Sequence, residues 1–221
     1  MRKILQFCWG TNGKTVRPDS RCQRRGRGRM GRVVLMTAGL LLLSARLVQA
    51  QFTVLHEFSG SDGASPFGSL TLSGSTLYGT TSSGGSSDRG AVFRINTNGT
   101  GFTLLHEFAG SDGANPNGSL TLSGSTLYGM TAYGGSSGKG TVFSMNTDGT
   151  GFTILHSFSG PDGFEPWGSL TLSGSTLYGM TSSGGSSGKG AVFSMNTDGT
   201  GFTILHEFAG SDGANPNGSL T

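Results

Sequence analysis

The chain has 221 residues, of which 41 are glycine, a formal net charge of +3 and only 12% charged residues. Glycine makes up nearly a fifth of the sequence, against about 7% in an average protein, so an ordinary helical globule is not expected. Residues 1–50 hold 11 of the 15 lysine and arginine side chains, and residues 51–221 carry a net charge of −7, so the later segment is not expected to bind nucleic acid.

The N-terminal segment has the pattern of a secretory signal peptide. Basic residues precede an apolar run, 33–43, that is too short to span a bilayer, and Val48-Gln49-Ala50 supplies a small-x-small end. This order is typical of an exported protein, and we predict cleavage after Ala50, with Met30 as a conventional start. A buried apolar helix is the alternative interpretation, and the Arg24-Arg25 pair makes twin-arginine export a second route.

Both cysteines precede the expected cleavage site, at Cys8 and Cys22. The mature protein would then contain no disulfide, and its stability would come from packing alone. This is compatible with a protein of the bacterial envelope or one that is secreted. We expect no membrane span in the mature chain.

A repeat of 50 residues organises the rest of the sequence. The copies occupy residues 52–101, 102–151, 152–201 and, in part, 202–221. A glycine-rich period of this length is typical of propeller blades or solenoid coils.

Alternating apolar residues and turn residues predict four short strands in each copy. In the third copy the expected strands are 152–158, 169–172, 176–181 and 191–195, and an Asp-Gly pair closes the unit with a hairpin turn. Four antiparallel strands per repeat are the content of a propeller blade, so we predict an all-β, propeller-like fold of about 3.4 units. A β-solenoid is the alternative. Because propellers usually close with four to eight blades, we expect a fragment or a truncated gene whose open blade edges favour self-association.

One pattern in the repeat resembles a known family. It reads Leu-Tyr-Gly-(Thr/Met)-Thr, Gly-Gly, Gly-(Ala/Thr)-Val-Phe and Asn-Thr-(Asp/Asn)-Gly-Thr-Gly-Phe-Thr-(Val/Leu/Ile)-Leu-His, and it recurs at residues 77–106, 127–156 and 177–206. The pattern resembles the GloVer (Gloeobacter/Verrucomicrobia) tandem-repeat family. The resemblance implies an exported bacterial protein, often surface-attached through a C-terminal sorting segment, that is propeller-like and has no known catalytic residues. Here no such anchor is visible before Thr221.

A histidine recurs once per copy, at His56, His106, His156 and His206. We interpret these residues as packing histidines between blades, each with one ring nitrogen hydrogen-bonded to backbone. Metal binding is the alternative interpretation. The segment from Asp112 to Gly118 offers oxygen ligands of the kind that calcium loops use, but turn chemistry around Asp-Gly and Asn-Pro explains it more simply.

No set of residues predicts catalysis. The Gly-Lys-Gly loops at 138–140 and 188–190 lack the Ser or Thr that a phosphate-binding loop needs after its lysine, so we interpret them as hairpin loops. A glycosidase would need a pair of facing carboxylates, which nothing specific in the sequence indicates. We therefore expect a protein that is not an enzyme and that uses no cofactor and no metal.

Differences among the copies cluster at a few loop positions. These are 64, 65 and 67 and their counterparts, and also 83, 133 and 183. Neutral drift in solvated loops is one explanation, and a ligand surface is the other, because loops on a fixed scaffold are where binding varies. The candidate ligand-binding residues are Phe67, Tyr133, Phe164, Glu165 and Trp167. Aromatic rings there would suit sugar rings or a protein partner, unless a neighbouring blade covers them.

These observations favour a non-enzymatic secreted or cell-surface repeat protein with a structural or interaction role. A carbohydrate-binding propeller module, either by itself or as part of an exported hydrolase, is the alternative. The expected partner is a glycan or a surface protein.

Overall fold

The computed structural model describes residues 52–221. The expected signal peptide, the start at Met30 and the cleavage after Ala50 lie outside this range. Within it the chain forms strands, turns and irregular segments, which confirms the all-β prediction. Residues 52–221 contain no helix, and therefore no helix that is long and apolar enough to cross a membrane.

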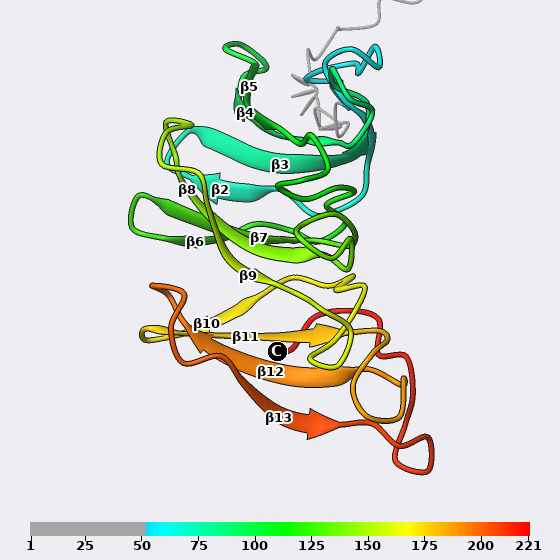
Figure 1. Ribbon diagram of the computed structural model, residues 1–221. Coiled ribbons are helices and arrows are strands. Elements are labelled where there is room, and N and C mark those ends of the chain that lie inside the picture. Colours follow the sequence, from blue (N-terminus) through cyan, green and yellow to red (C-terminus); the bar gives the residue numbers. More distant parts are fainter. Residues whose placement is uncertain (1–51) are drawn as a thin grey trace, which may run out of the picture. The chain divides into compact units, whose positions relative to one another are not determined.

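The strands form three antiparallel sheets that follow one another down Figure 1. The first sheet contains β2 (Thr71–Ser73), β3 (Thr76–Ser83), β4 (Ala91–Asn96) and β5 (Thr103–Glu107), and the short β1 (Ala64–Pro66) also pairs with β3. The second contains β6 (Thr121–Ser123), β7 (Thr126–Thr131), β8 (Thr141–Asn146) and β9 (Thr153–Ser157). The third contains β10 (Thr171–Ser173), β11 (Thr176–Thr181), β12 (Ala191–Asn196) and β13 (Thr203–Glu207).

The sheets are offset from the sequence repeats. Each sheet takes its last strand from the following copy, so that β5 belongs to the second copy, β9 to the third and β13 to the fourth. The stretch 53–57 corresponds to β5 in sequence, but it joins no sheet among residues 52–221.

The hairpin turns follow the local turn chemistry. Between β8 and β9 the carboxylate of Asp148 accepts hydrogen bonds from the backbone N–H of Thr150 at 2.9 Å and from its hydroxyl at 2.7 Å. Gly149 follows with a φ of 95°, in the region that glycine occupies without strain. The predicted Asp-Gly hairpin is therefore present.

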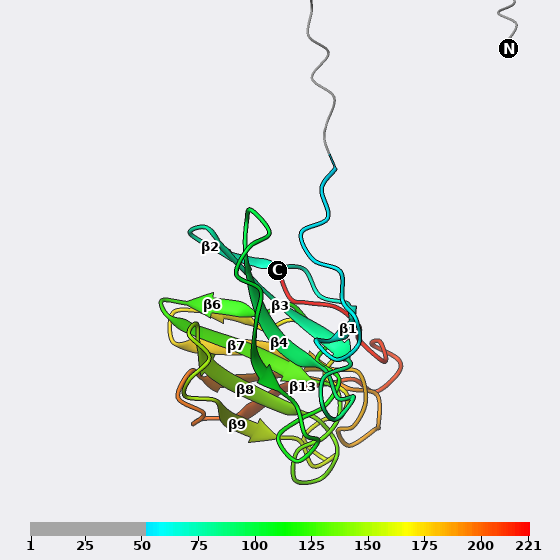
Figure 2. The ribbon, with the colours of Figure 1, turned by 90° about the horizontal axis from the view of Figure 1, so that it is seen from above.

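The core lies between successive sheets, which overlap when viewed from above in Figure 2. Its largest fully buried side chains include Phe108, Phe143, Phe158 and Phe193. The second sheet contributes apolar side chains to both cores, since Phe143 packs in one and Tyr128 in the other. Burial on both faces explains why its strands carry apolar residues at adjacent positions.

Hydrogen bonds that involve side chains also join neighbouring sheets at β2, β6 and β10 and the residues just before them. The N–H of Ser69 donates to Oγ of Ser119, and the N–H of Ser119 donates to Oγ of Ser169, each over 2.8 Å. The hydroxyl of Thr121 donates to the carbonyl of Leu170 in the same way. Four-stranded antiparallel sheets packed face to face and linked at their first strands form a propeller-like fold, as predicted.

Candidate binding site

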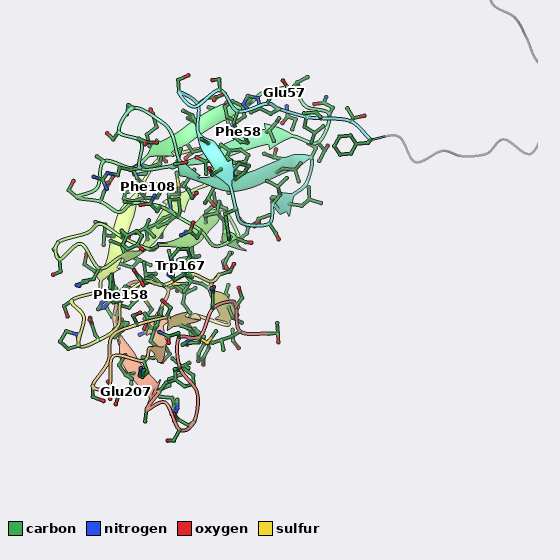
Figure 3. All side chains as sticks on the ribbon, turned by 90° about the vertical axis from the view of Figure 1, so that its right-hand side faces the viewer. Glu57, Phe58, Phe108, Phe158, Trp167 and Glu207 are labelled. Atoms are coloured by element: carbon green, nitrogen blue, oxygen red, sulfur yellow. The ribbon has the colours of Figure 1, made fainter. Side chains whose placement is uncertain are left out.

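Four of the five candidate residues meet where the second sheet packs against the segment before β10. Tyr133 lies in the loop between β7 and β8, whereas Phe164, Glu165 and Trp167 precede β10. All four side chains are half-buried. Figure 3 shows Trp167 at a level between Phe108 and Phe158, which mark the ends of the first and second sheets.

The aromatic rings of this cluster contact one another edge to face. The ring centroid of Tyr133 lies 6.2 Å from that of Phe164 and 6.5 Å from that of Trp167, distances typical of favourable aromatic pairs. The ammonium of Lys139 lies 4.1 Å from the centroid of the Phe164 ring, in a cation–π arrangement. We call these residues, together with Glu165, the aromatic cluster.

A side-chain hydrogen bond ties the two sides of the aromatic cluster together. The hydroxyl of Tyr133 donates to Oε1 of Glu165 over 2.8 Å. This hydrogen bond raises the pKa of Tyr133 above its ordinary value of 10.0, and partial burial and the charge of Glu165 act in the same direction. The phenol therefore stays protonated and acts as a donor at neutral pH.

Backbone geometry at Glu165 is unusual. Its φ is 57°, in the left-handed region that disfavours side chains other than Asn and Asp. Two other copies place Asn115 and Asn215 there, and Nδ2 of Asn115 donates to the carbonyl of Ser82 over 2.7 Å. The third copy thus replaces an amide link to the preceding sheet with the link from Glu165 to Tyr133.

Phe67 does not belong to this cluster. It occupies the position of Trp167 in the first copy, is 71% exposed and pairs with no aromatic ring among residues 52–221. Lys139 was not among the residues predicted from the sequence, although it lies in the Gly-Lys-Gly loop close to Tyr133. The four candidate residues other than Phe67 therefore contact one another where the second sheet meets the segment before β10.

The recurring histidines pack between repeats, but their hydrogen-bond partner is not backbone. Nε2 of His106 lies 2.9 Å from Oδ2 of Asp112, six residues further on. The imidazole stacks on Phe152 of the next copy, with 3.8 Å between ring centroids and 7° between planes. The prediction of a backbone partner was therefore wrong. Equivalent pairs join His56 to Asp62, His156 to Asp162 and His206 to Asp212.

The carboxylates of these pairs are also bound by nearby backbone. The N–H and the hydroxyl of Ser59 donate to Asp62 and lower its pKa from 3.8 to about 2. In the segment considered for calcium, Oδ1 of Asp112 accepts the N–H of Ala109. Within residues 52–221, no group of three or more His, Cys, Asp or Glu side chains is placed to hold a metal ion.

Comparisons with known proteins identify the fold and the family. No curated protein matches the sequence. Among solved structures, the chain is similar to one in a nidogen/laminin complex, at 18% identity and a TM-score of 0.50, over 69% of this chain and 51% of that chain. It is also similar to TolB from Acinetobacter baumannii, at 16% identity and a TM-score of 0.46, over 69% of this chain and 34% of that one.

The first of these likenesses concerns the fold alone, because the sequence identity is low. The chain spans about half the length of the nidogen/laminin chain, at 51%. The sequence of the Gloeobacter/Verrucomicrobia repeat matches residues 39–221, which include every sheet. With the recurring motifs, this match shows that the chain belongs to the Gloeobacter/Verrucomicrobia repeat family.

Proposed function

We propose that the protein is a non-enzymatic, exported repeat protein that binds a partner outside the cell or at its surface. The observation that carries this proposal is the aromatic cluster, in which Tyr133, Phe164 and Trp167 meet at positions where other copies carry Ser83, Ala114 and Asn117. Binding residues are often carried by loops that a rigid scaffold positions. The histidines and their aspartates, by contrast, bind one another in every copy.

Export rests on the N-terminal sequence pattern. The test is to express the full gene in a bacterial host, separate the culture medium and envelope from the cytoplasm, and sequence the N-terminus of the exported protein. We expect it to begin at Gln51. A soluble cytoplasmic protein that retains residues 30–50 would contradict export.

A glycan is the ligand class that suits the aromatic cluster best. Trp167 and Tyr133 are half-buried and offer aromatic surface on which the apolar face of a sugar can stack. Glu165 and Lys139 lie beside the rings and offer an acceptor and a donor for sugar hydroxyls. The ring of Phe164 is in contact with the ammonium of Lys139. In this proposal the main role of Phe164 is therefore to hold that ammonium in place.

The other copies supply a matched way to remove the aromatic cluster. A variant with Tyr133→Ser, Phe164→Ala, Glu165→Asn and Trp167→Asn carries at each position the residue of at least one other copy. It should therefore fold, and we expect it to lose binding on a glycan array while its melting temperature changes little. Phe67→Asn, the same replacement in the first copy, is the control and should bind like the unmodified protein. A lowered melting temperature without a binding phenotype would show that the rings serve only to pack the sheets.

A further inference from the structure

The interface between neighbouring sheets is built twice inside the chain from equivalent residues. In the second interface Tyr128, Met130 and Val142 of one sheet pack with Leu170 and Leu172 of the next. In the first interface Tyr78 and Val92 pack with Leu120 and Leu122. Each interface therefore has a tyrosine and valine side and a leucine side.

The first sheet leaves its leucine side uncovered. Leu70 is 49% exposed and Leu72 is 59% exposed, whereas the equivalent Leu120 is 4% exposed. Phe67 lies three residues before Leu70 and is also exposed. We call Phe67, Leu70 and Leu72 the leading face. Adjacent exposed apolar side chains of this size indicate an interaction surface.

The third sheet leaves its tyrosine and valine side partly uncovered. Its Tyr178, Met180 and Val192 are half-buried, although the equivalent residues of the second sheet are buried. We call these three residues the trailing face. The tail, residues 208–221, follows β13 and bonds to the start of this sheet. There the N–H of Ser169 donates to Oγ of Ser219 over 2.9 Å.

We propose that the leading face of one copy of the chain docks on the trailing face of a second copy. The molecules would then stack head to tail through the interface that already joins their own sheets. The match is specific, because residues 58–71 of the incoming copy differ from the tail at only three positions, 59, 65 and 67. Ser69 and Leu70 would take the places of Ser219 and Leu220. This assembly does not depend on the proposed glycan binding.

The tail must give way for this contact to form. It brings one leucine, Leu220, to the trailing face, whereas the incoming copy brings Leu70 and Leu72 on a complete sheet. The larger apolar burial favours the exchange, and β13 keeps its pairing with β12. Because the two surfaces differ, the contact is heterologous, and it produces either closed rings or open chains.

Cross-linking between two single-cysteine variants tests the contact. Ser69→Cys and Ser169→Cys are made in full chains whose Cys8 and Cys22 are replaced by serine, and the two proteins are mixed with a short bismaleimide. Each of these chains carries a single cysteine once Cys8 and Cys22 are replaced, so a link between positions 69 and 169 can only join two copies. We expect cross-linked dimers in the mixture and none from either variant alone. No product in the mixture, or equal product from a single variant, would overturn the proposal.

A second experiment separates this contact from nonspecific association. Leu70→Glu with Leu72→Glu alters two exposed side chains and should leave the fold intact, so sedimentation velocity should show a loss of the assembled species. Ser137→Glu adds a charge in an exposed loop away from the leading face and should assemble like the unmodified protein. If the double variant assembles to the same extent as the unmodified protein, the leading face is not the interface and the proposal fails.

Discussion

The imidazole of His106 lies flat on the ring of Phe152, with 3.8 Å between the ring centroids. The same stacking joins His56 to Phe102 and His156 to Phe202. Each pair spans two consecutive copies, and for His106 and His156 the stacking links the last strand of one sheet to the start of the last strand of the next. The aspartate that bonds each histidine holds the ring in position for this contact.

Replacing His106 with alanine should lower the free energy of unfolding by about 1–3 kcal/mol, because the variant loses one aromatic contact and one hydrogen bond. Chemical denaturation followed by fluorescence measures the change. His206 is the matched control, since it bonds to Asp212 but is more exposed and stacks on no phenylalanine of the next copy within residues 52–221. His206→Ala should cost less, and equal losses at both sites would contradict a role for stacking.

Stability should fall in acid between about pH 4 and pH 2. The pKa of Asp62 is about 2 in the folded protein, against an ordinary value of 3.8. A carboxyl with a lowered pKa stabilises the fold fully above its ordinary value and loses that contribution as the pH falls through the folded value. Hydrogen bonds from Ser159 and His156 also lower the pKa of Asp162, although burial opposes them.

Melting temperatures recorded from pH 6 to pH 2 test this expectation. The curve of Asp62→Asn should start lower at pH 6 and fall less steeply below pH 4, because the variant has lost one of the groups that titrate. Parallel curves for the two proteins would show that Asp62 does not contribute to the acid response.

At two glycines of the second sheet, alanine and asparagine substitutions should rank in opposite order of destabilisation. A Cβ on Gly129 would lie 2.5 Å from Cζ of the buried Phe143, so alanine should cost about 1–3 kcal/mol through overpacking, and asparagine more. A Cβ on Gly124 would meet no atom within 4 Å, and the residue has a φ of +58°. Asparagine tolerates that conformation better than alanine does, so Gly124→Asn should cost less than Gly124→Ala. The same order at both sites, measured by urea denaturation, would contradict this explanation.

The sequence predicts the strands well because strands and turns here depend on neighbouring residues. The expected strand 176–181 is β11, and the expected 191–195 is one residue shorter than β12. The pairing of the last strand of each sheet could not be predicted from the sequence in the same way. Near-identical copies offer the same partner in each sheet, so the sequence does not tell whether 153–157 pairs within its own copy or with the preceding one, as β9 does with β8.

The candidate site depends even more on contacts that are distant in the sequence. Tyr133 and Glu165 were both proposed from sequence differences among copies, but their hydrogen bond spans 32 residues and requires knowledge of which loops meet between sheets. The pairing of His106 with Asp112 is local, and the recurrence of the same spacing in every copy was a signal that could have revealed it.

The hydrogen bond between Tyr133 and Glu165 should couple the two residues energetically. A double-mutant cycle with Tyr133→Phe and Glu165→Ala removes the hydroxyl and the carboxylate, and alanine keeps a side chain at the same left-handed φ of 57°. Because the acceptor is charged and half-buried, we expect a coupling of about 1 kcal/mol in free energies of unfolding. Glu207→Ala, whose carboxylate bonds to Ser186, is the control partner for Tyr133→Phe and should act additively with it. A coupling below about 0.3 kcal/mol for the Tyr133–Glu165 pair, within the usual error of additivity, would mean that the bond does not help to hold the two sheets together.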